Sequence, residues 1–377
     1  MEQKRIGIVG VGNIAVKHIR ELQQVNECKI VALCDIDPQK LSEWGDKLDI
    51  PKDRRFTDYH DLVNCDAVEA VEVCTPNYLH VPVAVAAVQA GKAINVEKPL
   101  SVDLPSCESL SKALQKNPVP NMMCFSYRFM PAVRYAKWIL ERGLIGDIIS
   151  LDVAYLKDSA FFEGRRLEWR FVKEYAGTGV LGDLGVHLID MAELLVGQMQ
   201  EVSAVTDIII KKRKYLDGEE YGDVETDDYC SFLAKMENGV KGNFVITRCA
   251  VGQKNTIKYD IYGTKGMISF NLNDPAVLGI CAGEVDYMSG SVHTVNVPNK
   301  FYITQEQAFV EMLGGKVCDY FPTVENGLRC QHILDMLQLS AQEGPVLFFL
   351  LDAINIVSIL DIRGLCLRRW SQVATLF

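Results

Sequence analysis

A glycine-rich turn near the N-terminus constrains the fold of this chain more than any other feature. Gly10, Gly12 and Ala15 form the pattern Gly-x-Gly-x-x-Ala between an apolar stretch at 5–10 and a helical stretch at 14–24. The first glycine permits a tight turn, the second lets a pyrophosphate approach the backbone, and the small third residue lets helix and strand pack closely. The helix N-terminus, with Asn13 and Ile14, then faces the phosphates. The turn therefore predicts a dinucleotide site on a parallel sheet.

An acidic residue at the end of the next strand indicates which dinucleotide binds. The stretch 29–35 ends in Asp35, about 20 residues beyond the glycines, where a carboxylate can bind the ribose 2′-hydroxyl. The same charge repels a 2′-phosphate, so we predict NAD rather than NADP. Thr75, Pro76 and Asn77 end a later strand, and we expect them to line the nicotinamide ribose side. His80 is open to two interpretations, a cofactor contact or local hydrogen bonds at a helix start.

The order of apolar stretches predicts two different architectures. Up to residue 125, strands alternate with helices, which is typical of an α/β Rossmann domain with a parallel sheet. Helices are predicted at 132–142, 185–196 and 323–343. The later strand candidates are 148–155, 200–213, 226–236, 240–250, 255–263 and 266–271. Asn238-Gly239 is a hairpin signal between two of them, so the second part is expected to be α+β with a mostly antiparallel sheet. We predict domains at 1–125 and 126–347 and an extension of unknown role at 348–377.

Composition excludes several classes of partner. A chain of 377 residues is expected to form two domains, and its net charge of −10 argues against nucleic acid and anionic membranes. The twelve cysteines show no metal or redox spacing, so we predict no metal site and a reducing, cytoplasmic location. The first residues, MEQKRIGIVG, lead directly into a predicted strand, which argues against a signal peptide. The apolar stretch 345–360 contains Asp352 and Asn355, and we do not expect it to span a membrane.

Two further motifs follow the glycine turn in a fixed order. Glu97-Lys98-Pro99 ends the stretch 92–99, and GDLGVHLID occupies 182–190. With GIVGVGNIA (7–15), CTPNYLH (74–80), SYRFMP (126–131) and GTGVLGDLG (177–185), they resemble the glucose-fructose oxidoreductase and inositol dehydrogenase family, written Gfo/Idh/MocA. The matching pieces span roughly the first half of the chain.

The resemblance implies NAD(P)-dependent oxidation or reduction of a secondary alcohol on a sugar or cyclitol. The family's lysine, aspartate and histidine fall on Lys98, Asp183 and His187, and Glu97 lies with the cofactor-binding residues. A cis Lys98–Pro99 peptide and a homo-oligomer formed through the open second sheet are also implied. Leu184 stands where inositol-specific members tend to carry threonine, which weakens an inositol assignment. Residues 348–377 extend past the usual family end, and one interpretation of them is an oligomer arm.

Side-chain chemistry suggests roles for the catalytic set. His187 is our candidate base because the ordinary pKa of histidine lies near neutrality. Asp183, four residues earlier, is expected to orient His187 or hold a neighbouring substrate hydroxyl. Asp190 is a weaker candidate on a similar face. Lys98 is expected to donate to the reacting oxygen, or to act as the base if burial depresses its pKa.

A polar and aromatic segment before the aspartate is expected to select the substrate. Tyr127 and Arg128 lie in SYRFMP. The segment 155–171 adds a cluster of basic and aromatic side chains, namely Lys157, Phe161, Phe162, Arg165, Arg166, Trp169 and Arg170. Of these we select Lys157, Arg166 and Trp169 as substrate-binding, together with Tyr127, Arg128, Asp183 and His187. An aromatic ring in this segment would stack on a sugar face, and the site would accept a glycoside.

Three functional hypotheses remain open from the sequence. The first is an NAD-dependent dehydrogenase of a pyranose, of a pyranoside at its 3-hydroxyl, or of inositol, with a variant that retains NAD and recycles it on a keto-sugar. The second is a glycosidase that uses NAD transiently in an oxidation, elimination and reduction cycle. The third is a non-catalytic NAD(H) sensor, which would have no need of Lys98, Asp183 and His187.

Overall fold

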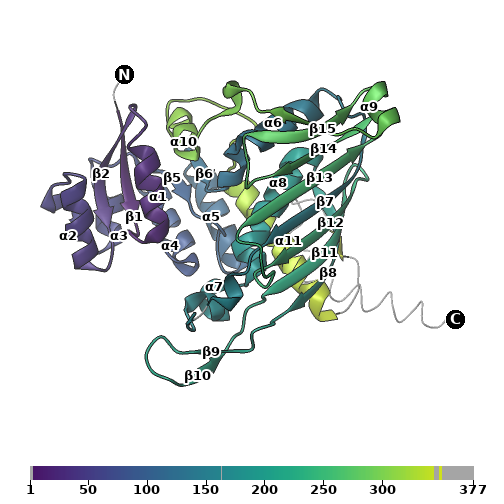
Figure 1. Cartoon of the computed structure of the whole chain (residues 1–377). Coiled ribbons are helices and arrows are strands. Elements are labelled where there is room, and N and C mark those ends of the chain that lie inside the picture. Colours follow the sequence, from purple (N-terminus) through teal and green to yellow (C-terminus); the bar gives the residue numbers. More distant parts are fainter. Residues whose placement is uncertain (1–2, 163, 344–347, 350–377) are drawn as a thin grey trace.

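The computed structural model describes residues 3–162, 164–343 and 348–349. Two sheets dominate these residues and lie side by side (Figure 1). The smaller sheet comes from the N-terminal third of the chain. The larger one forms a broad, twisted wall beside it.

The first sheet has six parallel strands in the order β3-β2-β1-β4-β5-β6. They are β1 (Lys4–Val9), β2 (Cys28–Cys34), β3 (Arg55–Phe56), β4 (Ala70–Val73), β5 (Ala93–Val96) and β6 (Asn121–Met123). The helices between them are α1 (Asn13–Leu22), α2 (Pro38–Lys47), α3 (Tyr59–Val63), α4 (Asn77–Gln89) and α5 (Leu104–Lys116). Local chemistry fixes their starts: the carboxylate of Asp37 accepts the backbone N–H groups of Gln39 and Lys40 and caps α2. The predicted Rossmann domain is confirmed.

The second sheet has nine strands in the order β16-β15-β14-β13-β7-β12-β11-β8-β17. They are β7 (Ile148–Leu156), β8 (Met199–Asp207), β11 (Tyr229–Met236), β12 (Lys241–Thr247), β13 (Thr256–Gly263), β14 (Gly266–Asn271), β15 (Val277–Ala282), β16 (His293–Asn296) and β17 (Phe348–Phe349). Only the pair β7–β12 is parallel among these strands. Asn238 and Gly239 join β11 to β12 as predicted, and Gly239 has φ +85°. The prediction of a mostly antiparallel second sheet is confirmed.

One predicted strand is divided in the structure. The stretch 200–213 gives β8 and then β9 (Lys212–Lys214), which pairs with β10 (Tyr221–Asp223) in a separate hairpin. This hairpin projects from the lower end of the large sheet (Figure 1). The break is not evident from the sequence, because Ile208, Ile209 and Ile210 continue the apolar pattern beyond the end of β8.

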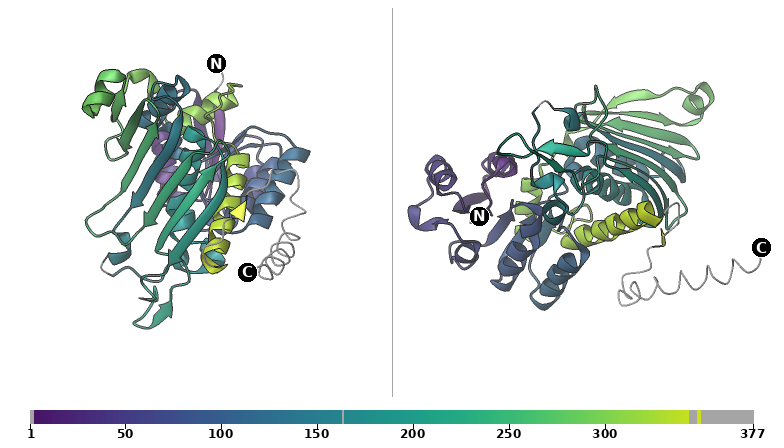
Figure 2. Two further views of the ribbon diagram at one scale, coloured as in Figure 1. Left: turned by 90° about the vertical axis from the view of Figure 1, so that its right-hand side faces the viewer. Right: turned by 90° about the horizontal axis from the view of Figure 1, so that it is seen from below.

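Helices cover one face of the large sheet (Figure 2). The remaining helices are α6 (Pro131–Glu141), α7 (Lys173–Ala176), α8 (Val186–Val196), α9 (Glu284–Ser289), α10 (Gln305–Leu313) and α11 (Val324–Glu343). Of these, α6, α8 and α11 lie against the inner face. In the part of the chain that the structure describes, no helix covers the outer face. Val205 of β8 and Leu233 of β11 on that face are 65% and 59% exposed.

Late elements of the chain pack against the first sheet. α10 contacts α1, and Phe309 and Phe321 share a buried cluster with Ile6, Ile8 and Ile19. α11 packs on both α5 and β8, so it lies between the two sheets. The core of the cofactor-side sheet is therefore completed by residues some 300 positions later in the chain.

The predicted extension 348–377 is described only at Phe348–Phe349, which pair with Val202 and Glu201 of β8. The rest of it, and most of the apolar stretch 345–360, lie outside the described residues. Among the helices that the structure describes, none is both long and apolar enough to cross a membrane.

Candidate active site

The glycine turn has the geometry of a phosphate cradle. Gly10 has φ +87°, and a Cβ there would lie 2.7 Å from the carbonyl oxygen of Cys74. Gly12 precedes α1 with no side-chain cap, and a Cβ built on it would meet no atom within 4 Å. The first-turn N–H groups of α1 therefore face open space, with exposed Asn13 and Ile14 beside them. These features fit a bound pyrophosphate.

Asp35 lies at the end of β2 beside this turn. Its carboxylate accepts the backbone N–H groups of Val11 at 2.7 Å and of Asp37 at 3.0 Å. Each oxygen keeps a second lone pair for a ribose hydroxyl. The negative charge is thus held where a 2′-phosphate would have to lie, which agrees with the predicted use of NAD.

A cavity of about 230 Å³ opens at the carboxyl end of the same sheet. Eight predicted site residues line it: Ile14, Thr75, Asn77, His80, Glu97, Lys98, Trp169 and Asp183. The hydroxyl of Thr75 is buried and has no hydrogen-bond partner among the described residues. The cavity continues from the glycine turn toward the large sheet, so it fits the nicotinamide end of the cofactor and a substrate beside it.

Lys98 and Asp183 meet in this cavity. The Lys98 Nζ donates to the carboxylate of Asp183 at 3.1 Å and to its backbone carbonyl at 2.8 Å. Burial alone would lower the pKa of Lys98, but Asp183 and Glu97 outweigh it and raise that pKa above its ordinary value. Burial likewise opposes the charge of Asp183, yet Lys98 and Arg170 hold its pKa well below the ordinary range. Both groups are therefore charged at neutral pH, and the condition for Lys98 to act as the base is not met.

The predicted cis peptide between Lys98 and Pro99 is present. His80 supports the same turn, because its ring nitrogens lie 2.7 Å from the carbonyl oxygen of Pro99 and 2.8 Å from that of Thr75. Burial lowers the pKa of His80, while the two carbonyl oxygens act in the opposite direction. This geometry favours the local interpretation of His80. Pro76 precedes α4 as its N-cap residue.

His187 lies in the first turn of α8 and is 7% exposed. Its ring packs against Tyr127 with centroids 4.5 Å apart, and the Tyr127 hydroxyl lies 3.0 Å from that of Tyr155. Burial and then the charge of Lys98 lower the pKa of His187 well below its ordinary value. Its Nδ1 is buried without a partner among the described residues. Asp183 bonds to Lys98 rather than to His187, so the expected orienting role of Asp183 is not seen.

A π-helical turn, Leu181–Gly185, presents Asp183 to the cavity. Asp227 holds this turn, because its carboxylate accepts the N–H groups of Gly179 at 2.7 Å and of Leu181 at 3.0 Å. A Cβ on Gly179 would clash with the backbone of Asp227. The glycines of the GTGVLGDLG motif thus allow the close approach that positions Asp183.

Three further polar side chains line the cavity without having been selected as site residues from the sequence: Arg170, Thr178 and Arg248. Arg170 belongs to the basic cluster seen in the sequence and stacks on Trp169, 4.4 Å from the ring centroid. Arg248 follows β12 and is anchored by Asp228 at 2.9 Å and by the carbonyl oxygen of Asp227 at 2.6 Å. No motif marks Arg248, which lies 65 positions beyond Asp183 in the sequence.

Other predicted residues are engaged elsewhere. Arg128 is 4% exposed and forms a bidentate ion pair with Asp190 at 2.7 and 2.6 Å. Because the two charges satisfy each other in the core, this geometry does not favour substrate binding by Arg128 or a catalytic role for Asp190. Arg166 donates to the carbonyl oxygens of Tyr215 and Gly218 and holds the β9–β10 hairpin, outside the cavity lining.

Lys157, like Tyr127 and His187, is not among the residues that line the cavity. Burial lowers its pKa, and the charges of Asp183 and Lys98 act on it in opposite directions. It therefore lies within electrostatic reach of Lys98 and Asp183.

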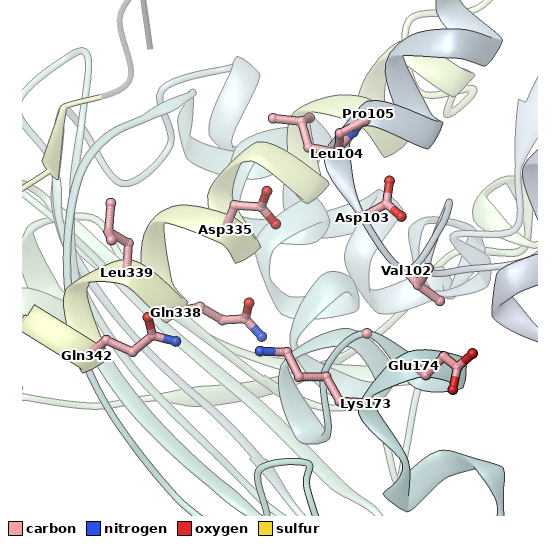
Figure 3. A pocket seen from close by; sticks show the side chains of 11 residues that line it. Val102, Asp103, Leu104, Pro105, Lys173, Glu174, Asp335, Gln338, Leu339 and Gln342 are labelled. Carbon is pink, nitrogen blue, oxygen red and sulfur yellow. The ribbon is translucent and has the colours of Figure 1, made fainter. Parts of the chain in front are cut away.

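A second cavity, of about 440 Å³, lies between α5, α7 and α11 (Figure 3). Lys173, Asp335, Gln338 and Gln342 point into it in the close-up. Its lining residues include none of the predicted site residues, so the smaller cavity is the candidate active site.

Comparison with known proteins agrees with this geometry. Residues 4–125 match the model of an oxidoreductase family with an NAD-binding Rossmann fold, and residues 133–269 match the GFO/IDH/MocA C-terminal domain. Levoglucosan dehydrogenase of Pseudarthrobacter phenanthrenivorans is 35% identical over 249 residues, which are 61% of this chain and 64% of the relative. The chain therefore spans slightly less than two thirds of that relative.

Two other similarities extend over more of the chain. Glucose-6-phosphate 3-dehydrogenase of Bacillus subtilis is 26% identical over 342 residues, which are 88% of this chain and 95% of the relative. The solved structure of levoglucosan dehydrogenase in complex with NADH and L-sorbose has a TM-score of 0.86 at 26% identity, covering 93% of this chain and 100% of that one. With the glycine turn and the two matched domains, these findings identify the chain as a member of the Gfo/Idh/MocA family of NAD-binding oxidoreductases.

Proposed function

We propose that this chain is an NAD-dependent dehydrogenase that oxidises a secondary hydroxyl of a pyranose or pyranoside. The observation that carries the proposal is the Lys98–Asp183 pair, whose charged groups face a cavity that continues from the cofactor turn. NAD⁺ supplies the hydride acceptor when it is bound at Gly10, Gly12 and Asp35. A division between a cofactor-binding part at 1–125 and a substrate-binding part at 126–347 belongs to the same proposal.

The residues take distinct roles in this reaction. His187 is neutral at physiological pH and accepts the hydroxyl proton of the substrate as hydride leaves the same carbon. The Lys98 cation donates to the reacting oxygen and stabilises its developing negative charge. Asp183 keeps part of its side chain, 46%, open to the cavity and accepts a neighbouring substrate hydroxyl. Trp169, with Arg170 stacked on it, packs against the sugar ring.

The names of the relatives support a pyranose substrate. Levoglucosan dehydrogenase and glucose-6-phosphate 3-dehydrogenase both act, by name, on derivatives of glucose, and the second name specifies carbon 3. Hydrogen-bonding and aromatic groups surround the cavity here as well. We therefore favour the 3-hydroxyl of a glucopyranose or glucoside over inositol.

A single-turnover experiment tests the proposal. The purified protein at high concentration, with equimolar NAD⁺, is mixed separately with glucose, levoglucosan, glucose 6-phosphate, aryl glucosides and myo-inositol. Reduced-nicotinamide absorbance is then recorded. A rise with a pyranose or pyranoside is expected, and a rise with myo-inositol alone would overturn the substrate class.

The same experiment separates the other hypotheses. Release of the aglycone from an aryl glucoside without net NADH would indicate the transient-NAD glycosidase. Measured NAD⁺ binding with no absorbance change and no aglycone release from any compound would indicate the sensor.

Two further parts of the proposal concern the protein in solution. Val205 and Leu233 lie exposed on the outer face of the paired strands β8 and β11, and exposed apolar side chains on a sheet face favour association. We therefore propose a homo-oligomer that pairs these faces, which sedimentation of the wild type and of Leu233→Lys would test. A cytoplasmic location is supported by the cysteines that the structure describes, all of which are free thiols.

A further inference from the structure

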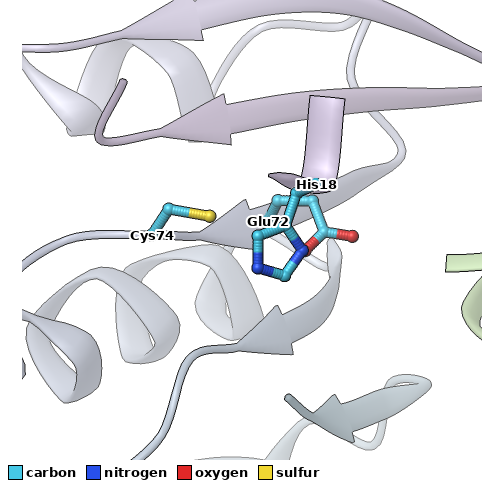
Figure 4. Close-up of side chains that lie close together, drawn as sticks. All are labelled: His18, Glu72 and Cys74. Carbon is cyan, nitrogen blue, oxygen red and sulfur yellow. The ribbon is translucent and has the colours of Figure 1, made fainter. Parts of the chain in front are cut away.

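A buried charged network lies behind Lys98. His18 extends from α1, and its Nε2 lies 2.9 Å from a carboxylate oxygen of Glu97. Its Nδ1 lies 2.9 Å from Glu306 of α10 and 3.6 Å from Glu72 of β4. His18 is 1% exposed, and Glu72, Glu97 and Glu306 are 0%, 7% and 0% exposed. Figure 4 shows the His18 ring close to Glu72 and Cys74.

The geometry determines the charge of His18. Each ring nitrogen lies 2.9 Å from a carboxylate oxygen of a different residue, and Nε2 also forms a hydrogen bond of regular geometry to Glu97, so these surroundings favour the imidazolium form. Burial lowers the pKa of His18, but the surrounding groups outweigh burial and raise that pKa well above its ordinary value. The titratable groups that act on this network are Lys17 and Glu21 of α1, Glu72 and Cys74 at β4, His80 of α4, Glu97, Lys98, Cys124 and Glu306.

Some of these groups are also common metal ligands. His18 lies with Glu72 and Cys74 on one side and with Glu97 and Cys124 on another, in each case with donor atoms within 4.8 Å of one another. A metal would need a nitrogen lone pair of His18. Since both nitrogens already face carboxylates at 2.9 Å, the geometry favours an ion-pair network over a metal site.

Glu97 connects this network to the candidate active site. One oxygen of its carboxylate faces His18, and the other accepts the backbone N–H of Lys98 at 3.0 Å. The Nζ of Lys98 then reaches Asp183. A continuous series of contacts thus runs from α10 and α1, through His18, Glu97 and Lys98, to the cavity.

We propose that His18 is a positioning residue for Lys98, which acts by keeping Glu97 ionised and in place beneath the Lys98 backbone. Glu306 supports it from the far side of the ring. The inference rests on the proposed function, in which Lys98 stabilises the reacting oxygen. Without the imidazolium, the buried carboxylate of Glu97 loses its closest cationic partner and its pKa rises, because a poorly compensated buried charge is costly. Protonation of Glu97 then weakens its hydrogen bond with the Lys98 backbone and removes a negative charge beside the Lys98 ammonium group.

A double-mutant cycle tests whether His18 acts through Glu97. His18→Gln removes the charge but keeps a side-chain amide, and Glu97→Gln removes the carboxylate. We expect each single variant to lower kcat by about 10-fold or more, and His18→Gln to cost less than about 2-fold further in the Glu97→Gln background. If the two losses multiply, His18 acts independently of Glu97 and the proposal is wrong.

The pH profile supplies a readout that a merely structural role would not move. In His18→Gln we expect the alkaline limb of kcat/KM to shift by about one unit to lower pH, because the pKa of Lys98 falls when Glu97 becomes neutral. His60→Gln is the matched control, since His60 is exposed on α3 and pairs only with Asp58 among the described residues. An unchanged limb in His18→Gln would overturn the proposal. Should that variant not fold, Glu306→Gln replaces it, because losing this carboxylate lowers the pKa of His18 and shifts the limb in the same direction.

A measurement without substrate keeps this inference separate from the proposed function. Lys98 is acetylated with limiting acetic anhydride across a pH series and quantified by mass spectrometry, since only the neutral amine reacts. We expect Lys98 to become reactive at lower pH in His18→Gln than in wild type. Identical curves would contradict the inference even if sugar oxidation is observed, and a shifted curve would support it even if no sugar is oxidised.

Discussion

Lys98 is bonded twice to Asp183, once through the aspartate carboxylate and once through its backbone carbonyl, at 3.1 and 2.8 Å. The two residues are separated by 85 positions and belong to the turn after β5 and to the π-helical turn before α8. One ammonium group therefore joins the cofactor-side sheet to the helix that carries His187. The active-site geometry depends on this junction.

Lys98→Met tests how much the Lys98 cation contributes to kcat/KM. The substitution keeps an unbranched chain but removes the cation, so the reacting oxygen loses its donor. We expect kcat/KM to fall by about 10²–10⁴-fold while NAD⁺ affinity, measured by fluorescence titration, changes by less than about 5-fold. Lys112→Met is the control, because Lys112 is exposed on α5. Full activity in Lys98→Met would contradict the assigned role.

His187→Gln tests the base. The pKa of His187 is lowered by burial, so in wild type kcat/KM should stay level as pH falls through 6.5, the ordinary value, and decline only below it. The variant should lose about 10²–10⁴-fold in turnover and should lack this acid limb. Steady-state rates between pH 5 and 9 check both points. If His187→Gln keeps its turnover, His187 is not the base.

Asp35→Ser should relax the choice of cofactor. The carboxylate beside the glycine turn repels a 2′-phosphate, and a hydroxyl does not. We expect the ratio of kcat/KM for NAD⁺ to that for NADP⁺ to fall at least about tenfold, which corresponds to roughly 1.4 kcal/mol. The same rates for exposed Asp66→Ser should match wild type. An unchanged ratio in Asp35→Ser would show that another group selects the cofactor.

Asp190→Asn should affect stability rather than catalysis. It leaves the buried guanidinium of Arg128 without its carboxylate, and breaking such a pair costs about 3–5 kcal/mol. Urea unfolding should show this loss, while kcat per folded molecule stays within about 3-fold. Glu141→Gln, at an exposed helix pair with Lys137, should cost no more than about 0.5 kcal/mol. If Asp190→Asn lowers turnover without lowering stability, Asp190 takes part in catalysis.

Glu72→Gln should change how stability depends on pH. Burial raises the pKa of Glu72 to about 7, although Asn95 donates to both of its oxygens. From its ordinary value near 4.5 up to about 7, the folded chain holds a proton that the unfolded chain releases, so wild type loses stability as pH rises through this window.

The amide of Glu72→Gln does not titrate. Relative to wild type, this variant should gain roughly 1–3 kcal/mol between pH 5 and pH 8. Urea unfolding at both pH values measures the difference, and Glu174→Gln serves as an exposed control. A constant difference across the two pH values would be inconsistent with a titrating Glu72.

Short-range patterns in the sequence predicted much of this structure. The glycine turn and the strand just before Asp35 depend on residues that are close in the chain, whereas the cis Lys98–Pro99 peptide was implied by the family resemblance. The partners of single charged side chains were harder to predict. Arg128 and Asp190 were each considered for function, but their mutual ion pair depends on how η2 (Ser126–Phe129) packs against α8.

Long-range contacts account for the cavity residues that were missed. Arg248 reaches the site because it forms an ion pair with Asp228 and donates to the backbone carbonyl of Asp227. The carboxylate of Asp227 in turn holds the π-helical turn that carries Asp183. Nothing in the local sequence around Arg248 encodes that arrangement. Likewise, Glu306 contacts His18 across 288 positions of chain, a pairing that no local pattern reveals.

The packing of α10 on α1 has a consequence for biosynthesis. Phe309 and Phe321 complete the apolar cluster that also contains Ile6 and Ile19, so this core remains open until about residue 321 has left the ribosome. The N-terminal, nucleotide-binding part is therefore translated first, but its hydrophobic core is completed only late in synthesis. Nascent chains that stop before this point should expose that cluster and recruit chaperones, and NAD⁺ should protect only chains that have passed it.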